Sequence, residues 1–173
     1  AILSSPSGLT FTVDDHEVSW SRLATDDGRI HLAVAEMMDE LARLSPDGPP
    51  RSAEFPLVLS AGERRAFTAN TIFRDRTWRK KDEDGALRVA PADAAAFGLT
   101  DGGRARVTTA AGSVEVTVEV AEVMRAGHMS LPNGFGIDGA GVSPNELTSY
   151  LHRDELAGTP LHKHVPARVE PVG

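Results

Sequence analysis

The chain has no cysteine among its 173 residues. A disulfide framework, a thiolate nucleophile, a cysteinyl zinc site and iron–sulfur ligation by these residues are therefore excluded. Aromatic residues make up only 5% of the sequence, and no apolar run approaches the roughly 20 residues that cross a bilayer. The first residues lack the basic start and apolar middle of a secretory signal, so we expect a soluble, cytoplasmic chain without a membrane span.

Positive charge is in short supply and unevenly placed. Acidic residues outnumber basic ones by 25 to 18, and the net charge of -7 argues against a nucleic-acid partner. Many basic residues nevertheless lie between positions 64 and 81. We expect Arg79–Lys81 to be a solvated helix face, because three acidic residues follow at once. Arg64 and Arg65 are better candidates for ligand contact.

The most informative segment is Phe55–Thr71, FPLVLSAGERRAFTANT. In it an apolar run is followed by an expected loop with one glycine and two adjacent arginines. Small residues let backbone N–H groups approach a ligand, and guanidinium groups match phosphate oxygens. The segment therefore predicts a phosphorylated ligand. A plain solvated turn explains the same composition about as well, because strand ends commonly carry Gly and Arg.

A break in composition divides the chain. Residues 45–52, SPDGPPRS, disfavour both helix and strand, which predicts an N-terminal appendage and linker over 1–52 and a main domain over 53–173. Because the chain begins at Ala1 without Met, on an apolar run, we expect a fragment whose appendage is the tail of a preceding domain.

Within the appendage, apolar residues recur at helical spacing over 31–44, which predicts an amphipathic helix. Short strands are expected around FTV, residues 11–13, and VSW, residues 18–20.

The main domain is predicted to be mainly β with short helices. Pro91 suits the first turn of a helix over 92–97, and Gly98 suits its left-handed end. About six strands with small helices between them favour a closed barrel over an open parallel sheet. No internal repeat is visible at a fixed period. The expected strands are 55–59, 87–89, 104–109, 113–120, 128–131 and 164–169.

Four blocks in this order resemble the C-terminal dinucleotide-binding domain of the molybdopterin oxidoreductases, the dimethyl sulfoxide reductase superfamily. The resemblance covers Phe55 to about Pro171, and the order and spacing of the blocks make it specific. The blocks are FPLVLSAGERRAFTANT (55–71), LRVAPADAAAFGLTDGGRARVTTAAGSVEVTVEV (87–120), MRAGHMSLPNGFG (124–136), and PNELT (144–148) joined to TPLHKHVPARVEP (159–171).

The resemblance implies a double-psi β-barrel that clamps bis-molybdopterin guanine dinucleotide, with molybdenum or tungsten, in a formate dehydrogenase-like oxidoreductase. It also implies that iron–sulfur clusters and the metal's protein ligand belong to upstream catalytic domains of the same polypeptide. The isolated chain is then expected to be inactive, with no catalytic and no metal-ligating residue of its own.

The resemblance also implies the cofactor-binding residues. Gly62 permits close approach, Arg64 or Arg65 pairs with phosphate, and Glu63 departs from the basic residue that the family frequently has. The implied set is Ser60, Ala61, Gly62, Arg64, Arg65, Phe67, Thr68, Asn70, Thr71, Asn145 and Lys163.

Local pattern alone gives simpler interpretations for several polar residues. Asn145 reads as a helix cap and Lys163 as a solvated strand residue. The Gly-rich loop that starts at Asn133 reads as a tight turn near the site. His162 and His164 alternate along an expected strand as a candidate metal pair, but no third ligand is evident nearby.

Two other functions fit parts of the pattern. A free-standing double-psi barrel that serves as a protein-recognition module predicts an exposed apolar patch and no polar, phosphate-sized groove. A small hydrolase using Ser60 or His128 with Asp138 is the weakest alternative, because no nucleophile motif such as Gly-x-Ser-x-Gly is present.

Overall fold

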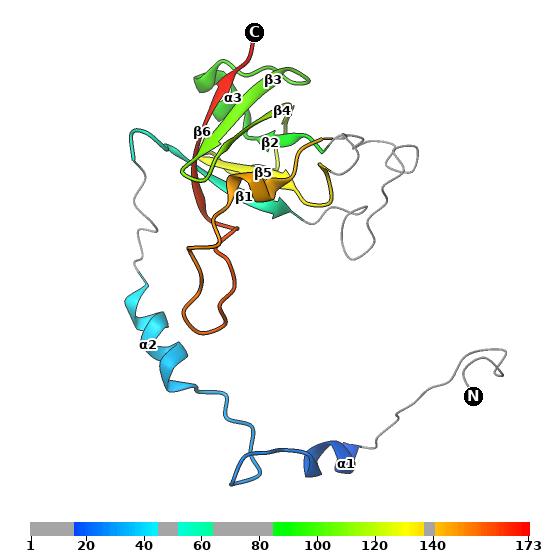
Figure 1. Cartoon of the computed structure of the whole chain (residues 1–173), viewed down its shortest axis with the longest axis vertical. Helices are drawn as coiled ribbons and strands as arrows, with labels where there is room; N and C mark the ends of the chain where they lie inside the picture. Colours follow the sequence, from blue (N-terminus) through cyan, green and yellow to red (C-terminus); the bar gives the residue numbers. More distant parts are fainter. Residues whose placement is uncertain (1–15, 45–51, 64–84, 137–140) are drawn as a thin grey trace, which may run out of the picture. The chain divides into compact units, whose positions relative to one another are not determined.

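A computed structural model describes residues 16–44, 52–63, 85–136 and 141–173 (Figure 1). The chain divides into two compact units, Ala1–Ser45 and Pro46–Gly173. In the first unit the described residues form two helices, α1 (His16–Ser21) and α2 (Ala35–Arg43). Within the described parts of the chain, no helix is long and apolar enough to cross a membrane.

In the first unit, one predicted element is confirmed and one is wrong. The helix predicted within 31–44 is confirmed as α2, and none of its residues is buried. The strand expected around VSW is wrong, because α1 covers residues 18–20. A short apolar run has too few residues to distinguish the period of a helix from that of a strand. The strand expected over 11–13 lies outside the described residues.

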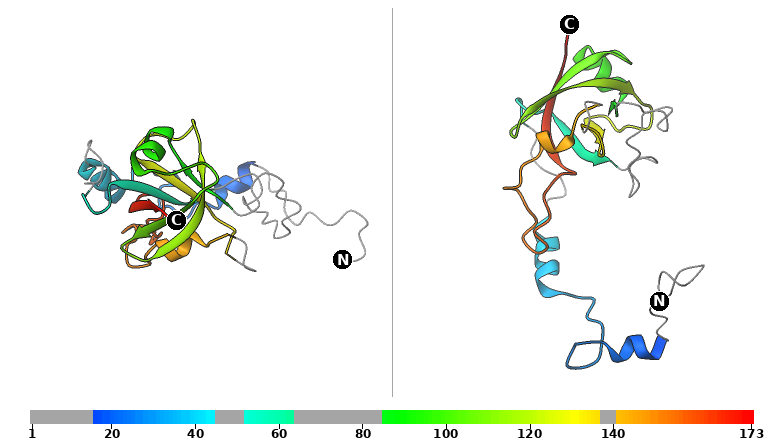
Figure 2. Two further views of the ribbon diagram at one scale, coloured as in Figure 1. Left: turned by 90° about the horizontal axis from the view of Figure 1, so that it is seen from above. Right: turned by 45° about the vertical axis from the view of Figure 1, so that its right-hand side comes forward.

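The second unit is a closed six-stranded barrel, which confirms the predicted fold class (Figures 1 and 2). Around the barrel the order is β1-β5-β2-β4-β3-β6. The pairs β1/β5 and β2/β4 are parallel, and the remaining four are antiparallel. The strands are β1 (Leu57–Glu63), β2 (Leu87–Val89), β3 (Arg104–Thr109), β4 (Ser113–Val120), β5 (His128–Pro132) and β6 (Val165–Pro171).

The pairing has an internal two-fold pattern. Exchanging β1, β2 and β3 for β4, β5 and β6 leaves every neighbour and every strand direction unchanged. Each half of the domain contributes one strand to each parallel pair, so the halves interlock as expected for a double-psi barrel. The sequence shows no matching repeat, because the same pairing is built from different side chains.

Aliphatic side chains fill the barrel. In β4, Val114, Val116 and Val118 are buried while the alternate residues are more exposed, as the period of two predicts. Leu59 and Leu131 are completely buried in the same cluster. Because an interior packed in this way has no room for a ligand, a binding site has to be built at an end of the barrel, where strands pass into loops.

The short helix α3 (Pro91–Phe97) fixes one of these ends. It starts at Pro91 and ends at Gly98, which has φ 68° in the left-handed region, as predicted. The carboxylate of Asp93 is buried and its Oδ2 accepts a hydrogen bond of 2.7 Å from Gly127 N. This bond ties α3 to the connection that leads into β5.

We expect Asp93→Ala to destabilise the domain by about 1–3 kcal/mol, because Gly127 N–H would lose its acceptor in a buried place. Asp93→Asn keeps an acceptor oxygen and should lose less. Urea unfolding of the two variants and the wild type measures the difference. Unchanged stability of Asp93→Ala would contradict this role of the carboxylate.

Candidate functional site

The strand β1 ends in a bulge at Gly62. Its pairing with β5 shifts by one residue between Ala61 and Glu63, and Gly62 has φ 88°. Residues with a β-carbon rarely adopt this conformation, whereas glycine does so without strain. A bulge bends its strand and changes the direction of the chain that follows. The expected end of the strand at residue 59 is therefore wrong, because Ser60–Glu63, predicted as the start of the cofactor loop, still belong to β1.

Two hydrogen bonds attach the segment before β6 to this bulge. Ala61 N donates a hydrogen bond to His162 O, and Lys163 Nζ donates one to Gly62 O. The donor–acceptor distance is 2.8 Å in both. The Lys163 side chain is exposed, so its charge stays at the surface beside the end of β1. Residues about a hundred positions apart in sequence thus meet at one place.

The 3-10 helix η3 (Pro144–Leu147) brings Asn145 to the same end of the barrel. The helix packs against β1 and β4, and its last carbonyl accepts a 2.9 Å bond from Thr109 Oγ1. Ser143 is the N-cap, since its Oγ accepts from Asn145 N at 3.3 Å. The interpretation of Asn145 as a helix cap is therefore wrong, and its exposed amide is available for other contacts.

These elements border a pocket of about 500 Å³. The predicted residues Ala61, Gly62 and Asn145 line it, and the bond from Lys163 to Gly62 joins that cation to its rim. Ser60 is paired with Ser130 in the β1/β5 ladder and does not line the pocket. The full lining is Ala61, Gly62, Asn133, Pro144, Asn145, Thr148, Ser149, Tyr150, Pro160 and His162.

The other predicted residues of the loop are not placed by the structure. They are Arg64, Arg65, Phe67, Thr68, Asn70 and Thr71, which lie outside the described residues. Asp138, the partner required by the hydrolase alternative, also lies outside them.

Asn133 is a polar residue of the pocket that the sequence analysis assigned only to a tight turn. Its Oδ1 is buried, and within the described part of the chain no donor reaches it. A buried oxygen without a partner costs about 1–3 kcal/mol, which an N–H group of a ligand would recover. In the sequence, the one indication was its place in the Gly-rich loop that follows an expected strand. That this strand pairs with β1 is seen only in the fold.

The two histidines near Lys163 do not form a metal pair. His162 lines the pocket at Gly62, whereas His164 lines a separate cavity of about 530 Å³. Both precede β6, which starts at Val165, so the expected alternation along a strand is wrong at this point. Among the described residues, no group of three or more His, Cys, Asp or Glu side chains could hold a metal ion.

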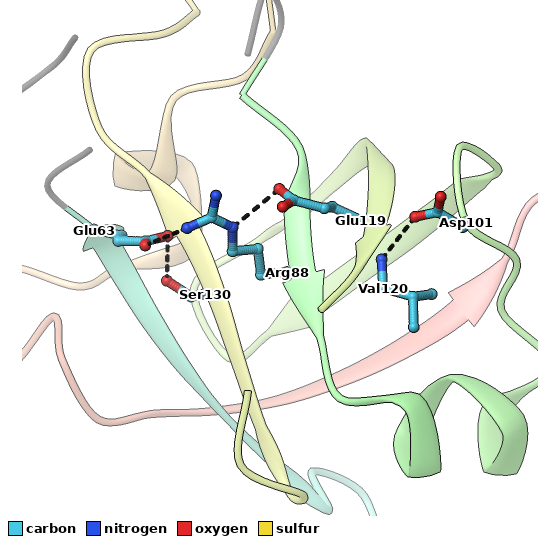
Figure 3. A network of polar contacts seen from close by, with 6 residues as sticks. All are labelled: Glu63, Arg88, Asp101, Glu119, Val120 and Ser130. Carbon is cyan, nitrogen blue, oxygen red and sulfur yellow. Dashed lines mark hydrogen bonds and ion pairs between the residues drawn. The ribbon is translucent and has the colours of Figure 1, made fainter. Parts of the chain in front are cut away.

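Glu63, the acidic residue at the end of β1, takes part in a network across four strands (Figure 3). Its Oε1 accepts from Arg88 Nη1 at 3.0 Å, and its Oε2 accepts from Ser130 Oγ at 2.8 Å. Arg88 Nε donates in turn to Glu119 Oε2 at 3.0 Å. The guanidinium therefore compensates the negative charge of Glu63 at the end of β1.

The second unit is thus a closed barrel with a pocket beside the bulge at the end of β1. Residues 57–166 match the model of the family described as molydopterin dinucleotide binding domain. This match spans more than half of the chain, so the chain belongs to this family of molybdopterin oxidoreductase domains, as its sequence blocks predicted.

Solved structures agree with the fold. Among 49 matching chains is acetylene hydratase from Pelobacter acetylenicus, with a TM-score of 0.62 and 20% sequence identity. The match covers 84% of the present chain and 21% of that protein, so this chain corresponds to about a fifth of the enzyme's length. A search of curated proteins gave no match.

The network of Glu63 predicts a measurable effect on stability. Arg88→Met leaves two carboxylates without their shared cation in a half-buried place, and we expect a loss of about 1–2 kcal/mol in urea unfolding. The control is Arg106→Met. Arg106 Nη2 donates a hydrogen bond of 2.8 Å to Glu115 Oε1, which raises the pKa of Arg106, but this pair is exposed to solvent, where ion pairs contribute little to stability. That variant should show no measurable change, and equal losses in both would contradict the role of Arg88.

Proposed function

We propose that this chain is the C-terminal cofactor-binding domain of a molybdenum or tungsten oxidoreductase of the formate dehydrogenase type, and that it clamps bis-molybdopterin guanine dinucleotide. Family membership supplies the ligand class. One observation supports the proposed position of the cofactor: Gly62 and Asn145 line a single pocket, and Lys163 is hydrogen-bonded to Gly62 at its rim.

The residues of the pocket suit such a ligand. Its volume of about 500 Å³ is within the range of small-molecule sites. The amide of Asn145 can donate to and accept from the edge of a heterocycle. Because an ammonium group has three N–H bonds, the contact of Lys163 with Gly62 leaves two for a phosphate oxygen. Arg64 and Arg65 stay in the proposal as sequence-based predictions for phosphate contacts.

When bound, the cofactor supplies the redox chemistry. The residues of this chain bind it, orient it and close it off from water. The chain has no cysteine, so any iron–sulfur cluster of the enzyme belongs to its other domains, which would be the partners of this one. On this proposal the isolated chain binds the cofactor without catalysing a reaction.

The alternative of a protein-recognition module has one observation in its favour. Leu151 and Leu161, which are 74% and 53% exposed, border the second cavity and provide exposed apolar surface. The same alternative predicts that a polar groove is missing. Most of the surface of the pocket beside Gly62 is apolar, but it also contains the polar side chains of Asn133, Asn145 and His162, and these groups favour cofactor binding.

Calorimetry with purified guanylyl-molybdopterin tests the proposal. We expect the wild-type chain to bind and the double variant Asn145→Ala/Lys163→Met to bind at least about tenfold more weakly, because it loses an amide and a cation. Glu146→Gln is the matched control, since it changes an exposed residue of η3 that does not line the pocket.

Absence of binding by the wild type, or equal affinity of the double variant and the control, would contradict the proposal. Circular dichroism and a urea midpoint for each variant separate a lost contact from a lost fold.

A further inference from the structure

The hydrogen bond of His162 determines what its ring can offer to the pocket. Nδ1 lies 2.8 Å from Pro160 O, and a carbonyl oxygen only accepts hydrogen bonds, so Nδ1 carries the proton. In the neutral imidazole, Nε2 then has a free lone pair. No described residue donates to Nε2. His162 therefore presents an acceptor.

The position of the ring places this acceptor beside Gly62. A β-carbon built on Gly62 would lie 3.8 Å from His162 Cδ2, the atom bonded to Nε2. Both residues line the pocket, so this edge of the ring belongs to the wall where the resemblance places the cofactor. The resemblance itself assigns no role to His162.

Asn133 adds a second acceptor to the same wall. Its buried Oδ1 has no donor within the described residues, and the β-carbon built on Gly62 would lie 3.8 Å from its Cβ. The last torsion of an Asn side chain is soft, so the amide can turn its oxygen toward a ligand. The pocket thus combines two acceptors with the exposed amide of Asn145, which can also donate.

A ligand that satisfies this set needs two adjacent N–H donors and a carbonyl oxygen on one planar edge. The 2-amino-4-oxopyrimidine edge has a ring N–H, an exocyclic NH₂ group and a carbonyl oxygen in a row. Guanine and pterin share this edge, whereas adenine presents an amino group beside a bare ring nitrogen.

We propose that His162 Nε2 and Asn133 Oδ1 accept hydrogen bonds from a 2-amino-4-oxopyrimidine edge bound in this pocket. The proposal rests on the function proposed above and adds two ligand-contacting residues to it. It also makes the pocket selective: guanine or pterin binds, and adenine is rejected because its ring nitrogen would face an acceptor.

The first test uses three ligands with the 173-residue chain, in calorimetry at pH 8: GMP, 6-hydroxymethylpterin and AMP. We expect GMP or the pterin to bind at least about tenfold more tightly than AMP. The tighter of the two identifies the end of the dinucleotide that occupies the pocket. Equal affinity for AMP, or no binding of either expected ligand, would overturn the proposal.

The second test separates the two nitrogens of His162. His162→Asn keeps an N–H near the position of Nδ1 for Pro160 O but removes the acceptor at Nε2. His162→Gln extends an amide to the position of Nε2 and loses the bond to Pro160. We expect about tenfold weaker binding of the preferred ligand by His162→Asn and a smaller loss, below about threefold, for His162→Gln. A purely structural role of the ring predicts the reverse order.

Two further variants complete this test. Asn133→Leu removes the second acceptor at similar volume and should weaken the same ligand by about tenfold. His164→Asn is the control, because His164 lines the other cavity and its substitution should leave the affinity unchanged. Unchanged binding by both His162→Asn and Asn133→Leu would overturn the proposal.

The outcomes distinguish this inference from the proposed function. If guanylyl-molybdopterin binds the wild type and all of these variants equally, the two new contacts are wrong while the cofactor assignment stands. If GMP binds with the expected selectivity but guanylyl-molybdopterin does not bind, the pocket has the proposed chemistry and the cofactor assignment fails.

Discussion

Two hydrogen bonds between the end of β1 and the segment before β6 hold the candidate site together. Ala61 N donates to His162 O, and Lys163 Nζ donates to Gly62 O. The first closes one wall of the pocket, and the second keeps a positive charge at its rim. Both bonds are made at the bulge of β1, where the register with β5 shifts and Gly62 has a positive φ. The polar groups of the site therefore surround a place where the regular ladder is interrupted.

The packed barrel supports the elements of the site, and the network of Glu63 compensates the negative charge at the end of β1. Aliphatic side chains fill the interior, so the chemistry of the domain lies where strands end. Glu63 brings a negative charge close to a site proposed for a phosphorylated ligand. Arg88 bonds to it and to Glu119, and Ser130 donates to its second oxygen. The negative charge of Glu63 is thus balanced within the barrel wall and does not by itself oppose an anion in the pocket.

Most strands and the barrel could be predicted from the sequence, because alternating and continuous apolar runs report burial directly. Asn145 and Lys163 could be proposed as site residues only through the family resemblance, because local pattern alone favoured a helix cap and a solvated strand residue. Asn133 could not be proposed in this way, because its significance depends on a buried oxygen that only tertiary packing leaves without a donor. The alternation of His162 and His164 misled because the chain turns there before β6 begins. Likewise, the two-fold pairing of the barrel leaves no trace in the sequence, since it constrains backbone directions and not residue types.

The central claim is that the ligand binds at the end of β1, between Gly62, Asn145 and Lys163. Titration of guanylyl-molybdopterin into the ¹⁵N-labelled chain, followed by amide chemical shifts, tests it most directly. The account predicts that the largest changes occur at Ala61, Gly62 and the neighbouring residues of the pocket. The connection before β5 contacts the opposite, starting end of β1, where Val58 N donates to Gly127 O. Chemical-shift changes confined to this connection and to α3 would contradict the central claim.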